Sequence, residues 1–412
     1  MNPTVELVST GAELLSGRTV NTHAQLLAQH LALLGLSLAR DTTIPDERAV
    51  LSAAVTEALT RASIVVVSGG LGATSDDITR DAVADAIGAE LVIHEDTRAG
   101  IRQRYARTNR MWSEAVSRNA LILSGAEVLS NRVGLAPGEM IAWRDKLIFL
   151  LPGPPREFEA VLVDHIVPRL RALVEEQPLQ QVFEMVGIGE SDVVRLLPED
   201  NFPGTGVSVA YCARPASVEL RLSALPGASA EHACAVAIVR ERLGEWIYAE
   251  SQIELELVLV DLLRRMGATV ATAESCTGGL VGHRLTNVPG SSEIFLGGVI
   301  AYANASKVRD LGVPAELIER VGAVSAEVAL AMAGGVRERF GADFGLGITG
   351  IAGPGGGTEL KPVGLVYIAC ASANGDVARE FHFTGPRETI KERSSQMALD
   401  LLRRQAGVRA LT

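Results

Sequence analysis

Cysteine is scarce in this sequence, and its four copies are scattered. Cys212, Cys234, Cys276 and Cys370 form no CxxC pair and no spacing typical of a metal site. A disulfide framework is therefore not expected, and this cysteine usage is typical of a reducing cytoplasm. The first residues form neither a basic segment nor an apolar run, so no signal peptide is expected. We accordingly expect a cytoplasmic location.

Basic residues are fewer than acidic ones, with 38 Lys and Arg against 49 Asp and Glu, which gives a formal net charge of −11. Duplex nucleic acid is bound through a concentrated basic patch, so direct nucleic-acid binding is not expected. A small anion needs less, because one arginine or a helix N-terminus can bind it. Apolar runs reach only the length of a strand, which predicts no membrane span.

Aromatic residues make up only 4% of the chain, whereas hydrophobic residues reach 47% and there are 41 glycines. This composition is typical of a soluble α/β enzyme. A chain of 412 residues is too long for one ordinary core, so two or three domains are expected.

Strand-like and helix-like segments alternate in both halves of the chain. The apolar run at 64–68, for example, precedes a helical pattern at 77–87. Alternation of this kind predicts a parallel sheet with helices on both faces. Between about 173 and 249 the pattern changes to that of antiparallel strands. We therefore predict two Rossmann-like three-layer αβα domains, at 1–170 and 251–412, joined by a small α+β connector at 171–250.

Ser275 is the first candidate for chemistry in the second αβα domain. It follows a predicted strand at 268–273 and precedes the helix start Thr277-Gly278-Gly279. Ligands of open α/β sheets bind at the carboxyl ends of strands, and a helix N-terminus there offers free amides to an oxyanion or a phosphate. Serine and threonine are also common helix caps, and from this motif alone capping is the simpler interpretation.

A serine nucleophile needs a base, and no Ser-His-Asp set is evident. His283 and His382 are the histidines of this domain, and neither lies in a glycine-rich turn. A lysine can serve if burial lowers its pKa, and Lys307 lies just beyond a predicted strand at 298–302. The alternatives are a solvated surface lysine and, for Tyr302, a half-buried core tyrosine. As a functional group, Tyr302 would polarise the serine or orient the lysine.

A glycine-rich loop runs from Thr349 to Gly357 after a third predicted strand at 345–349. Glycines at such density, Gly353 among them, let backbone amides approach a ligand closely. The alternative is a flexible loop, which the position at a strand end disfavours.

Five motifs in this domain, in order along the chain, resemble the C-terminal domain of the CinA (competence/damage-inducible protein A) family. They are Ala273-Glu274-Ser275-Cys276-Thr277-Gly278-Gly279, the pair Tyr302 and Lys307, Gly322-Ala323-Val324-Ser325, Thr349-Gly350-Ile351-Ala352-Gly353-Pro354, and Lys361-Pro362-Val363-Gly364. In that family the domain is a nicotinamide mononucleotide deamidase. The resemblance implies the same reaction here, in a pathway of pyridine nucleotide salvage.

The resemblance also implies roles for individual residues. Ser275 would be the nucleophile and Lys307 its base, while Tyr302 and Thr349 would line the site. Arg387 resembles the family's basic residue for the nucleotide, and Pro386 stands where the family usually has an acidic residue.

The implied reaction is an acyl transfer that needs no metal or other cofactor. The amides of Thr277, Gly278 and Gly279 would bind the oxyanion, and donors of this type are typically worth about 3–4 kcal/mol. Cys276 is the alternative nucleophile, disfavoured because the resemblance assigns the role to Ser275.

The N-terminal domain has its own candidate site, at the end of the predicted strand 64–68. Gly70 and Gly72 would let a phosphate approach the backbone. Asp76 and Asp77 follow, and two interpretations are about even: acids that bind a divalent metal bridging a pyrophosphate, or acids favoured at a helix N-terminus by its dipole.

Four runs here resemble the N-terminal CinA domain, which looks like molybdopterin-binding proteins. They start at Ser9, Ser68, Asn131 and Leu151. The resemblance implies a metal-dependent ADP-ribose pyrophosphatase that yields AMP and ribose 5-phosphate, with Mg, Mn or Co as the metal. Our candidate polar residues are, in falling order, Asp77, Glu13, Asp46 and Glu157, with Asp77 and Glu13 as candidate metal ligands.

The N-terminal domain also departs from the family. Ala73 stands where proline is usual, and Arg118 and Asn119 stand where the family reads Lys-Gln. If that pair serves the substrate, Arg118 and Asn119 would serve it less well. The connector run Gly187-Ile188-Gly189-Glu190-Ser191 does match the family.

Two alternatives to a two-activity enzyme stay open. The N-terminal domain could bind a pterin without catalysis, or the protein could act in competence or DNA damage through a protein partner such as a recombinase. We also expect a homodimer, because symmetric dimers are common among such enzymes.

Overall fold

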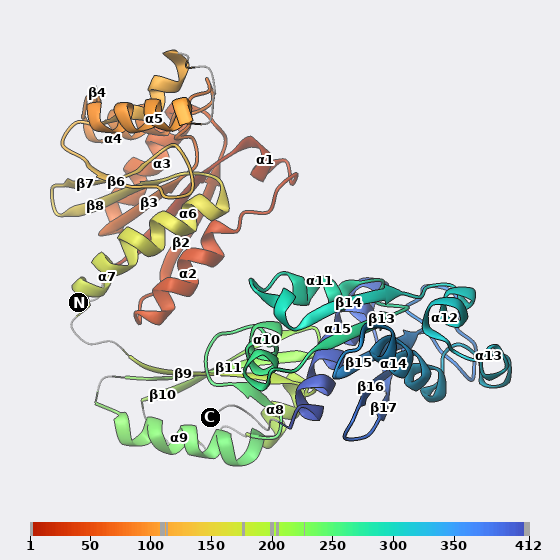
Figure 1. The fold of residues 1–412 in the computed structure, drawn as a ribbon. Helices are drawn as coiled ribbons and strands as arrows, with labels where there is room; N and C mark the ends of the chain where they lie inside the picture. The colour runs from red at the N-terminus through yellow and green to blue at the C-terminus, as the bar shows by residue number, and fades with distance from the viewer. Residues whose placement is uncertain are drawn as a thin grey trace. The chain divides into compact units, whose positions relative to one another are not determined.

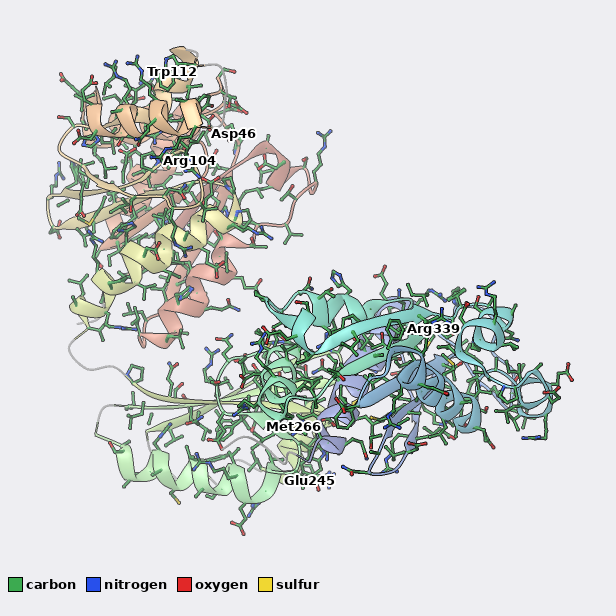
Figure 2. All side chains as sticks on the ribbon, viewed as in Figure 1. Asp46, Arg104, Trp112, Glu245, Met266 and Arg339 are labelled. Atoms are coloured by element: carbon green, nitrogen blue, oxygen red, sulfur yellow. The ribbon has the colours of Figure 1, made fainter. Side chains whose placement is uncertain are left out.

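The computed structural model describes residues 3–107, 112, 114–174, 178–197, 202, 206–225 and 227–407. The chain divides into two compact units, at 1–178 and 179–412, which run from red to yellow-green and from there to blue in Figure 1. Side chains fill the space between sheets and helices within each unit (Figure 2). Within the described residues, no helix is long and apolar enough to cross a membrane.

The first unit is built on a six-stranded sheet in the order β2-β1-β3-β8-β7-β6. Its first four strands are parallel, and β7 and β6 extend the sheet in the antiparallel sense. The strands are β1 (Val5–Thr10), β2 (Leu38–Ile44), β3 (Ile64–Ser68), β6 (Glu127–Leu129), β7 (Gly138–Trp143) and β8 (Lys146–Leu151).

Both faces of this sheet are buried, because successive side chains of a strand point to opposite sides. On one face Val65 and Val67 pack with helices α3 (Arg48–Arg61) and α4 (Thr79–Ile87). On the other, Val66 packs with α2 (His23–Leu33) and α6 (Pro155–Val161). The remaining elements of the unit are α1 (Ala12–Leu15), β4 (Leu91–Ile93), α5 (Glu95–Arg107), η1 (Glu114–Ala120), β5 (Leu121–Leu123), η2 (Leu162–Ile166) and α7 (Val167–Leu173).

The second unit begins with a small antiparallel sheet in the order β10-β11-β9-β12. Two helices pack on it around a core that includes Phe183, Leu220 and Val239. The elements are β9 (Leu179–Val186), α8 (Glu190–Leu196), β10 (Val207–Arg214), β11 (Ser217–Ala224), α9 (Ser229–Leu243) and β12 (Ile247–Ala249).

A five-stranded sheet in the order β14-β13-β15-β16-β17 follows. The strands β14, β13 and β15 are parallel to one another. Strand β16 pairs antiparallel with β15, and β17 pairs antiparallel with β16. The strands of this sheet are β13 (Val270–Glu274), β14 (Phe295–Ile300), β15 (Phe344–Gly350), β16 (Leu365–Ser372) and β17 (Val377–His382), with the 3-10 turn η4 (Ser291–Glu293) before β14.

Helices cover both faces of this sheet as well. Leu346 and Ile348 pack with α10 (Leu255–Met266), α11 (Leu280–Thr286) and α15 (Arg387–Gln405). Ala271 and Ala273 face α12 (Asn304–Leu311), α13 (Ala315–Val321) and α14 (Ala326–Phe340). The predicted class, two αβα domains and an α+β segment between them, is confirmed.

Three local expectations were wrong. Strand β14 ends at Ile300 rather than 302, so Tyr302 lies in the following loop with 62% of its surface exposed. Helix α4 begins at Thr79 rather than 77, which leaves Asp76 and Asp77 in the preceding loop. Neither sheet is wholly parallel, because alternation of strands and helices does not specify the direction of the edge strands.

Candidate functional sites

Ser275 lies in the tight turn between β13 and α11. Its amide donates to the Ile348 carbonyl of β15 at 2.9 Å, which fixes the turn at the carboxyl end of the parallel strands. The preceding Glu274 is buried, and its carboxylate accepts the amides of Gly279, Val281 and Gly282 at 2.9, 3.1 and 2.8 Å. Glu274 therefore satisfies the first amides of α11 and curls the turn around the nucleophile.

Lys307, on α12, is brought directly to Ser275. Its Nζ lies 3.2 Å from Ser275 Oγ and donates to the Ala301 carbonyl at 2.9 Å. The side chain is only 2% exposed, and within the described ranges no carboxylate pairs with it. Burial lowers the pKa of Lys307, because the charged ammonium loses hydration, while the nearby Cys276 thiol opposes that shift.

Cys276 is a poor alternative nucleophile in this setting. Burial raises the pKa of its thiol to about 12, so the thiolate that would react is not formed near neutral pH. Ser275, which contacts Lys307, is the better placed of the two neighbours.

Tyr302 is placed differently from the expectation that it polarises Ser275 or orients Lys307. Its hydroxyl accepts a hydrogen bond from Arg387 Nη2 at 2.8 Å, and Arg387 Nη1 donates to the Gly353 carbonyl at 2.6 Å. Arg387 thus links the loop after β14 to the glycine-rich loop after β15. Among the described contacts, the Tyr302 hydroxyl has no hydrogen bond to Ser275 or Lys307.

A cavity of about 270 Å³ joins these groups. The predicted residues Ser275, Lys307, Tyr302, Thr349, Gly353 and Arg387 all line it. The hydroxyl of Thr349 donates to the Ala323 carbonyl at 2.8 Å, so this side chain holds two cavity walls together.

The expected oxyanion donors are largely engaged elsewhere. The Gly278 amide donates to the Ser275 carbonyl at 3.1 Å, and the Gly279 amide donates to Glu274. Thr277 is fully buried, and none of the three lines the cavity. Both glycines adopt left-handed backbone angles, φ 63° and 96°, so the glycines serve the turn itself.

Two residues of this site were not found from the sequence. Asn304 lines the cavity from the first position of α12, three residues before Lys307 and on the same helix face. That spacing is the signal that would have found it. The sequence indicates Glu274 only as part of a motif, because residue spacing alone does not predict that its carboxylate caps α11.

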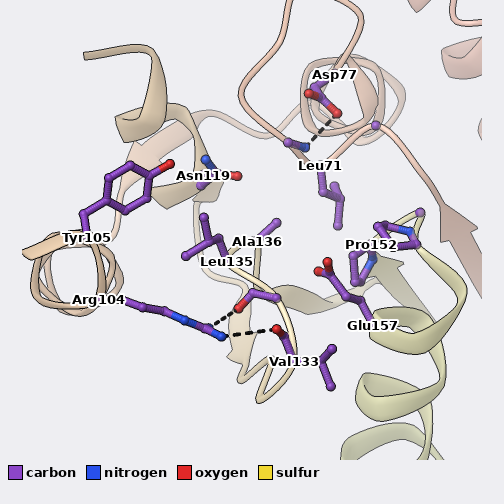
Figure 3. Close-up of a pocket in the computed structure, with 15 residues that line it drawn as sticks. Leu71, Asp77, Arg104, Tyr105, Asn119, Val133, Leu135, Ala136, Pro152 and Glu157 are labelled. Atoms are coloured by element: carbon purple, nitrogen blue, oxygen red, sulfur yellow. Dashed lines mark hydrogen bonds between the residues drawn. The ribbon is translucent and has the colours of Figure 1, made fainter. Parts of the chain in front are cut away.

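Gly70, Asp77 and Gly153 line two cavities of the N-terminal unit. The larger, about 560 Å³, is drawn in Figure 3. Gly72 and Glu157 line it as well. The smaller, about 220 Å³, is lined by the other predicted residues Glu13, Asp46 and Asp76. The predicted residues of the N-terminal site are thus divided between two neighbouring cavities.

Asp77 organises the loop before α4. Its carboxylate accepts the Gly72 amide at 2.7 Å and the amide and hydroxyl of Thr74 at 2.8 and 2.6 Å. A side chain on Gly72 would collide with this carboxylate, since its Cβ would lie 2.4 Å from Asp77 Oδ2. The oxygens of Asp77 are therefore engaged in shaping the loop.

The other acids are similarly engaged. Asp46 accepts the Thr10 hydroxyl and the Ala12 amide, both at 2.8 Å, and Glu157 accepts the Asn131 side-chain amide at 2.7 Å. In the part of the chain that the structure describes, no three His, Cys, Asp or Glu side chains gather as a metal site. The two candidate metal ligands, Asp77 and Glu13, both line the smaller cavity.

Arg104 and Tyr105 of α5 also line the larger cavity, and sequence reasoning missed both. Figure 3 shows Arg104 reaching the loop opposite, where it donates to the carbonyls of Gly134 and Val133 at 2.6 and 3.2 Å. Asn119 lines the same cavity. No pattern singles out the α5 pair, because α5 is polar around most of its surface.

Comparison with known families matches three consecutive parts of the chain between residues 6 and 406. Residues 6–172 match a probable molybdopterin binding domain, 180–249 the damage-inducible protein CinA KH domain, and 252–406 the CinA C-terminal domain. CinA-like proteins of Gemmatimonas aurantiaca and Kosmotoga olearia are 42% and 40% identical. In both cases 97% of this chain is covered, with 96% and 98% of the relative.

Among solved structures, a competence/damage inducible protein from Agrobacterium tumefaciens is 40% identical. That likeness covers 36% of this chain and 92% of the other, with a TM-score of 0.36. The two CinA-like relatives, 40% and 42% identical over 97% of this chain, show that the chain belongs to the CinA family.

Proposed function

We propose that the C-terminal site hydrolyses the carboxamide of nicotinamide mononucleotide, giving nicotinate mononucleotide and ammonia. The observation that carries this proposal is the 3.2 Å contact between Ser275 Oγ and the buried Nζ of Lys307. A lysine that burial favours in its neutral form can accept the proton of a serine hydroxyl. The setting of these groups in a cavity matches acyl transfer better than simple helix capping.

The proposed reaction has two steps. In the first, Ser275 Oγ bonds to the carboxamide carbon as Lys307 Nζ takes its proton, and the C–N bond then breaks while that proton passes to the leaving ammonia. In the second, water adds to the acyl-enzyme, Lys307 takes a proton from it, and the ester bond to Ser275 breaks. The proton returns to Ser275 Oγ, so atoms and charge balance without a cofactor.

The oxyanion of each step needs a donor other than the Gly278 and Gly279 amides. The Cys276 amide is best situated, because it follows the nucleophile directly and its residue lines the cavity. Among the described residues, this amide donates to no backbone carbonyl. A donor in that position is typically worth about 3–4 kcal/mol of transition-state stabilisation.

The amidase is tested by incubating the full chain with nicotinamide mononucleotide, without added metal, and measuring ammonia and nicotinate mononucleotide. We expect release by the wild type, loss by about 10³-fold or more in Ser275→Ala, and retained release in Cys276→Ala. Loss of release in Cys276→Ala together with retained release in Ser275→Ala would identify Cys276 as the nucleophile instead. Absence of release by the wild type would leave an interaction role in competence or DNA damage as the better hypothesis.

A second proposed activity is hydrolysis of ADP-ribose to AMP and ribose 5-phosphate by the N-terminal unit. Two adjoining cavities along the Gly70–Asp77 loop suit a substrate with two bulky ends and a pyrophosphate between them. Magnesium-type ions commonly bind through one or two carboxylates together with substrate phosphates. Mg, Mn or Co would therefore arrive with the phosphates of the substrate.

This second activity is tested by measuring AMP release with each metal and with a chelator. We expect metal-dependent release that falls at least about tenfold in Asp77→Asn, because the loop along both cavities loses its organising carboxylate. Asp145→Asn, at an exposed turn, is the control. Pterin binding without AMP release would favour the binding-only alternative.

A further inference from the structure

Lysine is rare in this chain, since Lys146, Lys307, Lys361 and Lys391 are the only four among 38 basic residues. Three of the four lie in the C-terminal domain. Lys307 contacts the nucleophile, and Lys361 donates to the carbonyls of Val321 and Val324, both at 2.7 Å, beside the cavity wall. These two lysines thus have defined contacts at or beside the site.

Lys391 lies on α15, four residues after Arg387, and side chains at that spacing share one helix face. The Nζ of Lys391 would lie 3.8 Å from a methyl group placed on Gly278. Gly278 belongs to the turn that carries Ser275. The two cations of α15 therefore approach the site at two points: Arg387 at the cavity lining and Lys391 at the nucleophile turn.

Among the described residues, neither cation is neutralised by an acid. Throughout the described ranges, no carboxylate forms an ion pair with Lys391 or Arg387. Arg387 donates instead to two neutral oxygens, the Gly353 carbonyl and the Tyr302 hydroxyl. Glu274, the acid of the turn, is engaged by three backbone amides. In a chain of net charge −11, these two cations share one helix face and form no ion pair among the described residues. Arg387 lines the cavity and Lys391 lies at the turn that carries Ser275, an arrangement that favours an anionic ligand.

We propose that Lys391 is a specificity-determining residue that binds, together with Arg387, the phosphate monoester of the substrate. This inference rests on the proposed amidase and adds the reason why a nucleotide rather than a nucleoside is accepted. Arg387 offers a planar pair of donors, and Lys391 offers a compact point charge on a flexible chain. Both form charge-assisted hydrogen bonds to phosphate oxygens, which are among the strongest hydrogen bonds in proteins.

The test compares nicotinamide mononucleotide with nicotinamide riboside, which carries the same carboxamide and lacks the phosphate. In Lys391→Met we expect the KM for the mononucleotide to rise about tenfold or more, with kcat changed little. The kinetic constants for the riboside should stay at the wild-type values. Lys146→Met, which removes the same charge from the N-terminal unit, is the matched control. It should leave the kinetic constants for both substrates at the wild-type values.

Two outcomes would overturn the role of Lys391. One is an unchanged preference for the mononucleotide in Lys391→Met, and the other is an equal loss with both substrates, which would indicate damage to the turn. If the wild type released no ammonia at all, the proposed amidase would fail first. Calorimetry with nicotinate mononucleotide and with inorganic phosphate would then still decide on Lys391: weaker binding by Lys391→Met supports the phosphate site, and equal binding contradicts it.

Discussion

The ammonium group of Lys307 sits beside Ser275 without a carboxylate partner in the described part of the chain. Its burial has two consequences that can be measured separately. As a general base, Lys307 works only when deprotonated, so activity depends on its pKa. As a buried cation, it destabilises the fold whenever it is charged.

The pH dependence of activity follows from the first consequence. Burial lowers the pKa of Lys307 below its ordinary value of 10.5. We therefore expect kcat/KM to rise with pH to a plateau, and the midpoint of that rise to lie below pH 10.5. Lys307→Met should reduce kcat by about 10²–10⁴-fold and abolish that rise. A wild-type profile with its midpoint at or above 10.5 would contradict the role of a buried base.

The second consequence predicts a pH dependence of stability. The unfolded chain binds a proton at Lys307 up to pH 10.5, whereas the folded chain loses it at a lower pH. Between those two values the unfolded state binds more protons, so the free energy of unfolding contributed by Lys307 rises with pH. Urea denaturation of the wild type and Lys307→Met across this window measures it, and parallel curves would show that burial leaves the pKa unshifted.

The sequence was sufficient to place residues that follow the end of a strand. Ser275 and Lys307 both follow strands that end at the same edge of a sheet, and the structure brings them into contact. The sequence was less informative where a role depends on side-chain reach. The pairing of Tyr302 with Arg387 spans 85 residues, and nothing in the local pattern specifies it.

At the scale of elements, the turn between β13 and α11 depends on the carboxylate of Glu274. Three amides donate to it, and a glutamine there would turn a donor toward at least one of them. We expect Glu274→Gln to lower the free energy of unfolding by about 1–3 kcal/mol and to reduce kcat, because Ser275 follows directly. Urea denaturation and amidase assays measure both effects.

The matched control for this prediction is Glu293→Gln, because Glu293 is an exposed acid whose ion pair with Arg264 lies at the surface. Surface pairs contribute little, so this variant should stay close to the wild type in both measurements. Equal behaviour of Glu274→Gln and Glu293→Gln would contradict the capping role of Glu274.

Elements and their layering were largely predictable from the alternation of strand and helix patterns. Their direction was not, as β16 and β7 show: both pair antiparallel with a neighbour in an otherwise parallel region. An apolar run has the same pattern in either direction, so only the connection and its packing decide. Helix α4 starts two residues late because Asp77 is drawn back to Gly72 and Thr74.

At the scale of the whole molecule, the segment at 179–250 shares a core with the domain that follows it. Val186 and Tyr248 belong to the same buried cluster as Leu255 and Leu259 of α10. The sequence indicated a change of character near 173 and again near 253, yet patterning cannot show which neighbour a small sheet packs against. The division of the chain at 178 therefore required the structure.

This shared core predicts how fragments behave. A fragment of residues 179–412 should keep the amidase site and unfold cooperatively, since its core is intact. A fragment of 251–412 loses Val186 and Tyr248, so its free energy of unfolding should be lower by about 2–5 kcal/mol. Its urea midpoint should fall accordingly. Equal urea midpoints for the two fragments would show that the shared cluster contributes nothing to stability.

In the proposed reaction, Ser275 is activated by the buried Lys307 and deamidates nicotinamide mononucleotide. The most direct measurement is mass spectrometry of the full chain trapped during turnover. We expect an acyl adduct on the peptide that contains Ser275, absent from Ser275→Ala and present in Cys276→Ala. An adduct on Cys276, or turnover by Ser275→Ala at the wild-type rate, would contradict it.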